Sequence, residues 1–138
     1  MEVRFVAGVT PIVESSARAR DFYGEKLGLP VRAEEGDYSV ADLEGVKHFG
    51  LWTLRDAAMS TFGREEWPTD LTRPQVTIEF EVDDVSAAVA ELRSRGTDVL
   101  QDAKVEPWGQ TTARLLSPEG ILLGVTYTPW LREGQSAQ

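Results

Sequence analysis

The sequence has no cysteine, a single histidine, and fewer basic than acidic residues, 14 against 23. The absence of cysteine excludes disulfides, thiolate chemistry and any zinc site that needs sulfur ligands. The net charge of −9 argues against nucleic-acid binding, because phosphate contacts require basic patches. No apolar run approaches the length of a membrane span, and no signal-peptide pattern opens the chain. We therefore predict a cytoplasmic protein with neither nucleic acid nor membrane among its partners.

What the sequence does contain is typical of one globular domain: 138 residues, of which 41% are hydrophobic and 27% charged. Within it, residues 8–23 (GVTPIVESSARARDFY) and 77–92 (TIEFEVDDVSAAVAEL) follow one plan. Each segment has a short strand pattern, an acidic or hydroxyl residue at a turn, and then a helix pattern. Such internal repetition predicts one βαβ-type unit that occurs twice, with a site between the copies.

Each half of the chain predicts the order βαβββ, with one further short strand in the second half. In the first half, alternation over 3–10 predicts a strand that Pro11 ends, and the following helix stops at Gly28. In the second half, a strand over 75–82 precedes a helix that Gly96 closes. Turn residues separate the remaining apolar runs into further strands. These lie near 31–35, 38–43 and 46–54 in the first half, and near 98–101, 103–107, 111–117 and 120–128 in the second.

The expected domain covers residues 1–130 and consists of two modules, at about 3–54 and 75–128. The linker over 55–74 is long for a compact domain, so it is either a lid over the site or a connection that crosses the molecule. The polar residues 131–138 predict a flexible tail.

Strand alternation also predicts which side chains face a cleft between the modules. On each opening strand one face is apolar and is expected to pack on the helix. The opposite face carries Gly8 and Thr10 in the first half, and Thr77, Glu79 and Glu81 in the second.

Three motifs carry a resemblance to a known family: DFYGEKLGLPV at 21–31, FEVDDVSAAVAELRSRG at 80–96 and EPWGQTTARLLSPEGILLGV at 106–125. With its paired βαβββ modules, the chain resembles the vicinal oxygen chelate superfamily of glyoxalases, extradiol dioxygenases, and fosfomycin and bleomycin resistance proteins. The resemblance implies an α+β fold in which the modules form a curved mixed sheet around a cleft. In appearance the chain is most similar to the metal-free binding proteins of the bleomycin resistance branch.

Metal-using members of that superfamily place His and Glu ligands at four strand positions. Carried over to this sequence, these positions fall on Gly8, Thr77, Gly124 and Gly50, or on Phe49 beside Gly50. Glycine offers no side-chain donor, and Thr and Phe are poor ligands for the metals concerned. We therefore predict no metal and no other cofactor.

Four titratable residues are candidates for the cleft. His48 is expected on the strand face of Trp52, either as a ligand contact or acid–base group, or as a hydrogen-bonded strand histidine. We favour Glu79 as the anchor for a cationic group or as a general base, and we expect Glu81 to be a solvated strand carboxylate. Tyr38 is a further candidate for ligand contact or proton transfer.

The four tryptophans favour a planar or cationic ligand, because indole rings stack on both. Trp108 lies in a Pro-Trp-Gly segment similar to one in the bleomycin resistance branch, and Trp52 is expected to face the cleft. Phe62 and Trp67 lie on the linker, where a lid would be. Core packing is the alternative for at least one tryptophan, and Trp130 is expected at an interface or loose.

These features predict a metal-free protein that sequesters an antibiotic or related natural product, as a homodimer. The alternative is a metal-independent enzyme, an isomerase, cyclase or lyase, on the same fold; a metal-dependent lyase or dioxygenase ranks third. Two arrangements of the modules are open: pairing within one chain, or swapping between two chains. The predicted ligand-binding residues are Trp52, Trp108, His48, Glu79, Phe62, Trp67, Thr77 and Tyr38.

Overall fold

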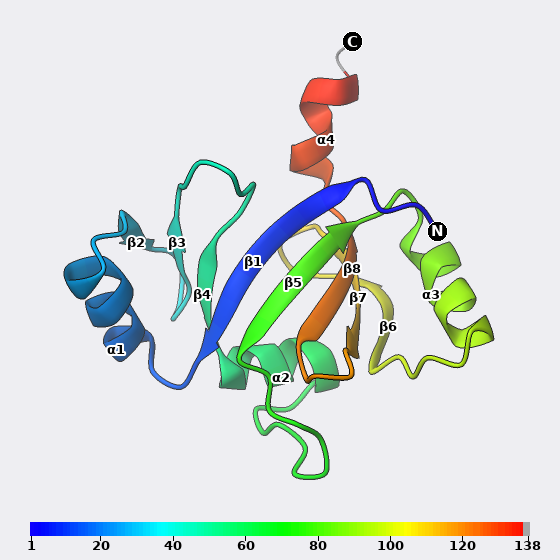
Figure 1. Ribbon diagram of the computed structural model, residues 1–138, viewed down its shortest axis with the longest axis horizontal. Coiled ribbons are helices and arrows are strands. Elements are labelled where there is room, and N and C mark those ends of the chain that lie inside the picture. The colour runs from blue at the N-terminus through cyan, green and yellow to red at the C-terminus, as the bar shows by residue number, and fades with distance from the viewer. Residues whose placement is uncertain (137–138) are drawn as a thin grey trace.

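The computed structural model describes residues 1–136, and for residues 133–136 it describes the backbone alone. In this part of the chain, eight strands form one sheet in the order β2-β3-β4-β1-β5-β8-β7-β6 (Figure 1). The strands are β1 (Phe5–Val13), β2 (Val31–Ala33), β3 (Ser39–Ala41), β4 (Gly50–Thr53), β5 (Val76–Glu81), β6 (Gln101–Val105), β7 (Thr111–Leu116) and β8 (Leu122–Tyr127). The helices are α1 (Ser16–Arg20) with its π-helical continuation η1 (Asp21–Lys26), α2 (Leu54–Phe62), α3 (Val85–Ser94) and α4 (Pro129–Ser136).

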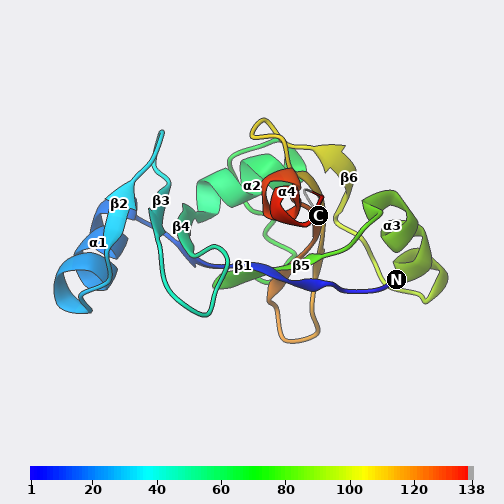
Figure 2. The same cartoon turned by 90° about the horizontal axis from the view of Figure 1, so that it is seen from above.

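The sheet consists of two βαβββ modules that join at its centre. In each module the first strand runs parallel to the last, β1 beside β4 and β5 beside β8. Strands β1 and β5 then pair antiparallel and connect the two modules within one chain. Figure 2 shows α2 and α4 on the same side of β1 and β5. The predicted fold class, an α+β fold of paired modules in a curved mixed sheet, is confirmed.

Local sequence signals begin and end the helices. Asp84 caps α3 by accepting a hydrogen bond from the Ala87 amide, and Thr53 caps α2 through the Asp56 amide. Gly63 follows α2 with a φ of 77°, a left-handed conformation that costs glycine little.

Helix α3 covers the second module. Its apolar face contributes Val85, Ala88 and Val89 to a core that continues through β7 and β8. This packing follows from the i, i+3, i+4 spacing of those residues.

The linker between the modules packs closely against the sheet. Helix α2 occupies its first part, and Trp67 is buried in a second core with Ala58 and Leu122. The Trp67 indole N–H donates to the Thr72 carbonyl at 3.0 Å and so fixes the loop that follows. Of the two alternatives for the linker, the packed connection agrees with these contacts.

Four local predictions differ from the structure. Strand β1 continues through Pro11 to Val13, because the Ile12 amide donates to the Gln75 carbonyl at 2.9 Å and keeps the pairing with β5. The pairing of β1 with β4 is instead interrupted between Val9 and Ile12, around the proline that lacks an N–H.

Residues 98–100 form no strand, so three strands follow α3 rather than four. His48 precedes β4 rather than lying within it. The predicted tail begins with helix α4, while residues 137 and 138 lie outside the described part of the chain. Over residues 1–136, no helix is long and apolar enough to cross a membrane.

Candidate functional site

A cavity of about 820 Å³ opens between the two modules. Its wall includes residues of β1, β4, β5 and β7, of α2, and of the first turn of α4. Three of the four tryptophans line it: Trp52, Trp108 and Trp130. Its acidic lining residues outnumber the basic ones, Glu34, Glu35, Asp56, Glu79 and Glu106 against Lys104 and Arg114.

The structure brings together six of the eight residues predicted to bind a ligand. Those that line the cavity are Trp52, Trp108, His48, Glu79, Thr77 and Tyr38. Phe62 and Trp67 are not among the lining residues. Their rings pack edge to face in the core beneath the sheet, with 5.0 Å between the ring centroids. They were expected in a lid, but Trp67 is 5% exposed and packs inward.

The glycines at the family's ligand positions make room for other side chains. Gly8 and Gly124 flank Glu79 on β1 and β8, and a Cβ atom on Gly8 would lie 3.3 Å from Glu79 Oε1. A Cβ atom on Gly50 would collide with the Tyr38 hydroxyl. Tyr38 and Glu79 therefore occupy space next to these positions.

This arrangement does not fit the metal that the superfamily uses. Gly8, Gly50 and Gly124 have no donor, and a ligand side chain on Gly50 would displace Tyr38. Among residues 1–136, no group of three His, Asp or Glu side chains is placed to hold a metal ion.

Tyr38 and His48 form a pair in the cavity wall. The Tyr38 hydroxyl hydrogen-bonds His48 Nε2. Burial raises the pKa of Tyr38, and the negative charge of Glu79 adds to the effect. Burial also lowers the pKa of His48. A protonated tyrosine donating to a neutral histidine agrees with both directions.

Glu79 is the carboxylate at the centre of the site. Burial raises its pKa, and this effect is opposed by the charge of Arg114 and by a hydrogen bond from Gln110. The Gln110 contact is long, 3.4 Å between Nε2 and Oε1. Glu79 therefore keeps the capacity to accept further hydrogen bonds from a ligand.

A second polar group, which the sequence did not reveal, surrounds Arg114. Its guanidinium is 1% exposed, lies 3.7 Å from Glu106 Oε1, donates to Ser60 Oγ at 2.7 Å and stacks over Trp52. Lys104 lies 3.3 Å from the same Glu106 oxygen. The two basic residues of the cavity are thus both paired with Glu106. The sequence did contain a signal for this buried group, because Arg114 is a charged residue inside the apolar run Ala113–Leu116.

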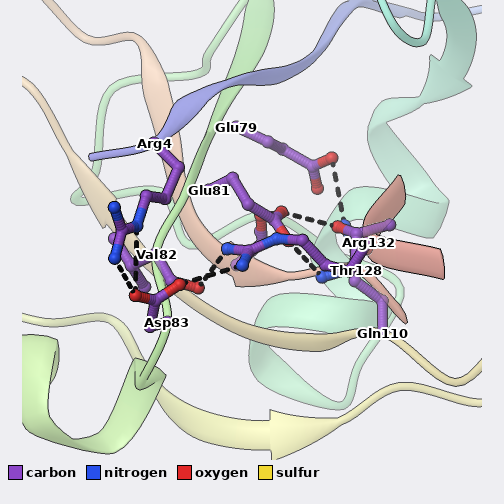
Figure 3. Close-up of polar contacts among 9 residues, drawn as sticks. Arg4, Glu79, Glu81, Val82, Asp83, Gln110, Thr128 and Arg132 are labelled. Carbon is purple, nitrogen blue, oxygen red and sulfur yellow. Dashed lines mark hydrogen bonds and ion pairs between the residues drawn. The ribbon is translucent and has the colours of Figure 1, made fainter. Parts of the chain in front are cut away.

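The expectation that Glu81 is solvated is wrong. Glu81 is completely buried and accepts hydrogen bonds from Thr126 Oγ1 at 3.0 Å, from Thr128 N and Oγ1 at 2.6 and 2.8 Å, and from Arg132 Nε at 3.1 Å (Figure 3). Arg132 comes from α4, which the sequence predicted to be a loose tail. Its positive charge compensates the buried carboxylate.

A comparison with family models decides the family. The model of the glyoxalase-like domain matches residues 6–127. The chain belongs to the glyoxalase-like domain family. Members of this family commonly bind small-molecule ligands and often form dimers. No curated protein sequence matches this glyoxalase-like chain.

Solved structures share the fold at low sequence identity. Methylmalonyl-CoA epimerase from Mycobacterium tuberculosis is 19% identical, with a TM-score of 0.61 over 95% of this chain and 93% of its own. A Streptomyces coelicolor methylmalonyl-CoA epimerase variant in complex with 2-nitronate-propionyl-CoA is 16% identical, with a TM-score of 0.61 over 92% and 96%. A glyoxalase/bleomycin resistance protein/dioxygenase superfamily member from Vibrio splendidus 12B01 is 16% identical, with a TM-score of 0.58 over 92% and 100%. These likenesses show the fold alone.

Proposed function

We propose that this glyoxalase-like protein binds a planar or cationic small molecule, of the antibiotic or natural-product kind, and sequesters it without a metal and without changing it. The observation that carries the proposal is the cavity of about 820 Å³ with three tryptophans in its wall. This volume lies within the usual range of sites for drug-sized ligands, and indole surfaces suit flat ligands.

The charge of the cavity favours a ligand with amino groups. Lys104 and Arg114 are both paired with Glu106. The other carboxyl groups of the lining therefore outnumber the basic groups left to balance them, and the cavity has an excess of negative charge. Glu79 has accepting capacity left. Thr77 Oγ1 is buried and has no hydrogen-bond partner among the side chains and backbone that the structure describes, so it can bond to a ligand.

The test is a tryptophan fluorescence titration with bleomycin-type glycopeptides and with polycyclic or quinone antibiotics, with and without EDTA. We expect saturable quenching at one ligand per chain that EDTA leaves unchanged. Trp67→Phe serves as the control, since Trp67 lies outside the cavity, and it should keep the quenching. Trp108→Phe should lose part of it. Absence of quenching across the panel, or quenching only with added metal, would contradict the proposal.

A metal-independent enzyme is the second candidate. It is favoured by Glu79, whose pKa is raised by burial, and by the Tyr38–His48 pair in the same cavity wall. Prolonged incubation of a bound compound with the protein distinguishes the two functions. Unchanged recovery supports sequestration, whereas conversion that Glu79→Gln abolishes supports the enzyme.

We also propose that the protein forms a homodimer. Phe22, Leu27 and Val105 are 51%, 57% and 71% exposed, and none of them lines the cavity. A second chain could cover such apolar surface. Light scattering of the purified protein tests this, and a monomer at all concentrations would contradict it.

A further inference from the structure

A continuous chain of hydrogen bonds connects the cavity carboxylate Glu79 to helix α4. It runs from Glu79 through Gln110 and Thr128 to Glu81 and Arg132 (Figure 3). Gln110, Thr128 and Glu81 are 5%, 2% and 0% exposed, so solvent has little access to the interior of this chain. The direction of each bond follows from the chemistry of its members.

The direction is set at Glu81. Each oxygen of its carboxylate accepts two hydrogen bonds, and one of these four bonds comes from Arg132. Since a carboxylate only accepts, the Thr128 hydroxyl must donate its one hydrogen to Glu81. The Thr128 oxygen is then an acceptor for Gln110, 2.9 Å from Nε2.

Gln110 is fixed from its other side as well. The Trp108 indole N–H, which can only donate, lies 2.9 Å from Gln110 Oε1. With the amide oxygen turned toward Trp108 and one hydrogen of Nε2 directed to Thr128, the second hydrogen is left for Glu79 Oε1. Two independent neighbours therefore determine the same orientation of the amide.

We propose that Gln110 is the positioning residue that holds Glu79 as a hydrogen-bond acceptor, so that the site next to Glu79 selects ligand groups that donate a hydrogen. The inference deepens the proposed function and rests on it for the ligand. The polarity is imposed from Glu81 and Arg132, which are not among the residues that line the cavity. A ligand amine or hydroxyl matches Glu79, whereas a ligand group that only accepts is disfavoured there.

Other charged groups also act on Glu79 and have to stay constant in a test. Arg114 on β7 favours the ionised form of Glu79, while Glu81, which lies on β5 with Glu79, and Glu106 in the β6–β7 loop oppose it. From the first module, Tyr38 and His48 face the same cavity. Strands β1 and β8 place only Gly8 and Gly124 directly beside Glu79.

The experiment is a carboxyl ¹³C NMR titration of Glu79 in the full-length protein without ligand, with the Glu79 signal assigned from Glu79→Gln. In Gln110→Leu the titration midpoint should rise, because the ionised form loses a donor. In Gln110→Glu, a variant of the same shape, it should rise further, because a second carboxylate is placed beside the first. An unchanged midpoint in Gln110→Leu, with the native circular dichroism retained, would overturn the proposal.

Two variants at Thr128 test the imposed polarity without altering Gln110 or Glu79. Thr128→Val removes the hydroxyl at nearly constant shape and should raise the Glu79 midpoint. Thr128→Ser keeps the hydroxyl and should leave it at the wild-type value. Equal midpoints in both variants would show that the orientation is not transmitted from Glu81. The NMR titration needs no ligand. If only the antibiotic titration fails, the proposed function is rejected, and the role of Gln110 in positioning Glu79 still stands.

Discussion

Two carboxylates on β5 show how neighbours decide the role of a residue. Glu79 and Glu81 have the same strand parity, yet Glu79 faces the cavity with one long hydrogen bond, and Glu81 is buried among four donors. The difference comes from Thr126, Thr128 and Arg132, which donate to Glu81 and not to Glu79. Glu79 therefore remains available for a ligand.

Gly50 is required by the position of Tyr38. In Gly50→Ala the new Cβ would collide with the Tyr38 hydroxyl, and we expect a loss of about 2 kcal/mol in the free energy of unfolding as the ring moves away from His48. Urea denaturation measures this loss. Gly24→Ala is the matched control, because its Cβ would lie 3.6 Å from Val31 Cβ, an ordinary contact. Equal stability of both variants would contradict the expectation.

Glu79 makes the stability depend on pH. Its pKa is raised above the ordinary 4.5 in the folded state, so the folded protein holds this proton more tightly than the unfolded chain. The wild type therefore loses stability as the pH rises from 4.5 through the raised pKa. Glu79→Gln lacks this loss, and its stability relative to wild type should increase over that range.

Urea denaturation at several pH values checks this prediction. Glu119→Gln controls for the net charge, since it removes one negative charge from an exposed turn. If the stability difference between Glu79→Gln and wild type stayed constant with pH, Glu79 would not be the group responsible.

At the scale of the element, helix α4 is held mainly by polar contacts. Neither hydrophobic core includes any of residues 129–132, the part of α4 whose side chains are described, and Figure 1 shows the helix projecting from one end of the sheet. Arg132 binds Glu81, Asp83 and the Val82 carbonyl, and its guanidinium lies over the rings of Phe5 and Tyr127. One side chain thus attaches the helix that brings Trp130 and Leu131 to the cavity.

Arg132→Ala should destabilise the protein by about 2 kcal/mol, because Glu81 would remain buried without its counter-charge. The loss is below that of a fully buried pair, since Arg132 is 15% exposed. Arg93→Ala removes an exposed pair with Asp102 and should change the free energy of unfolding by about 0.5 kcal/mol or less. Denaturant unfolding compares the two. Equal losses would show that Arg132 is an ordinary surface residue.

For the whole molecule, the important feature is that both modules of one chain build the cavity. Strands β1 and β5 join the modules, and Tyr38 of the first module faces the same cavity as Gln110 of the second. A dimer interface is therefore not needed to complete the wall.

The affinity of the protein for a cavity ligand should stay the same when the protein is diluted below the concentration at which a dimer dissociates. Fluorescence titrations at protein concentrations on both sides of that value, set by light scattering, test this. A fall in affinity on dilution would mean that a second chain contributes to the site.

The sequence predicts the architecture because its signals are local. The periods of the strands and helices, the Asp84 cap and the Gly96 stop depend on neighbours in the chain, and they specify two βαβββ modules. Strand parity alone also placed Thr77 and Glu79 at the cavity. The residue types at Gly8, Gly50 and Gly124 offer no side-chain donor to a metal.

The tertiary structure decided the surroundings of those side chains whose neighbours are distant in the sequence. Phe62 and Trp67 were expected at the ligand, but the end of α2 and the loop after it place them in the core with Leu122 of β8. Glu81 was expected in water, but Arg132, 51 residues away, makes its burial possible. The orientation of Gln110 likewise follows from Trp108 and Thr128 together. The sequence by itself determined most of the elements and the absence of side-chain donors at Gly8, Gly50 and Gly124, because both are properties of single residues and short spacings. Only the folded chain decided which polar groups meet, because those pairings join residues far apart in the sequence.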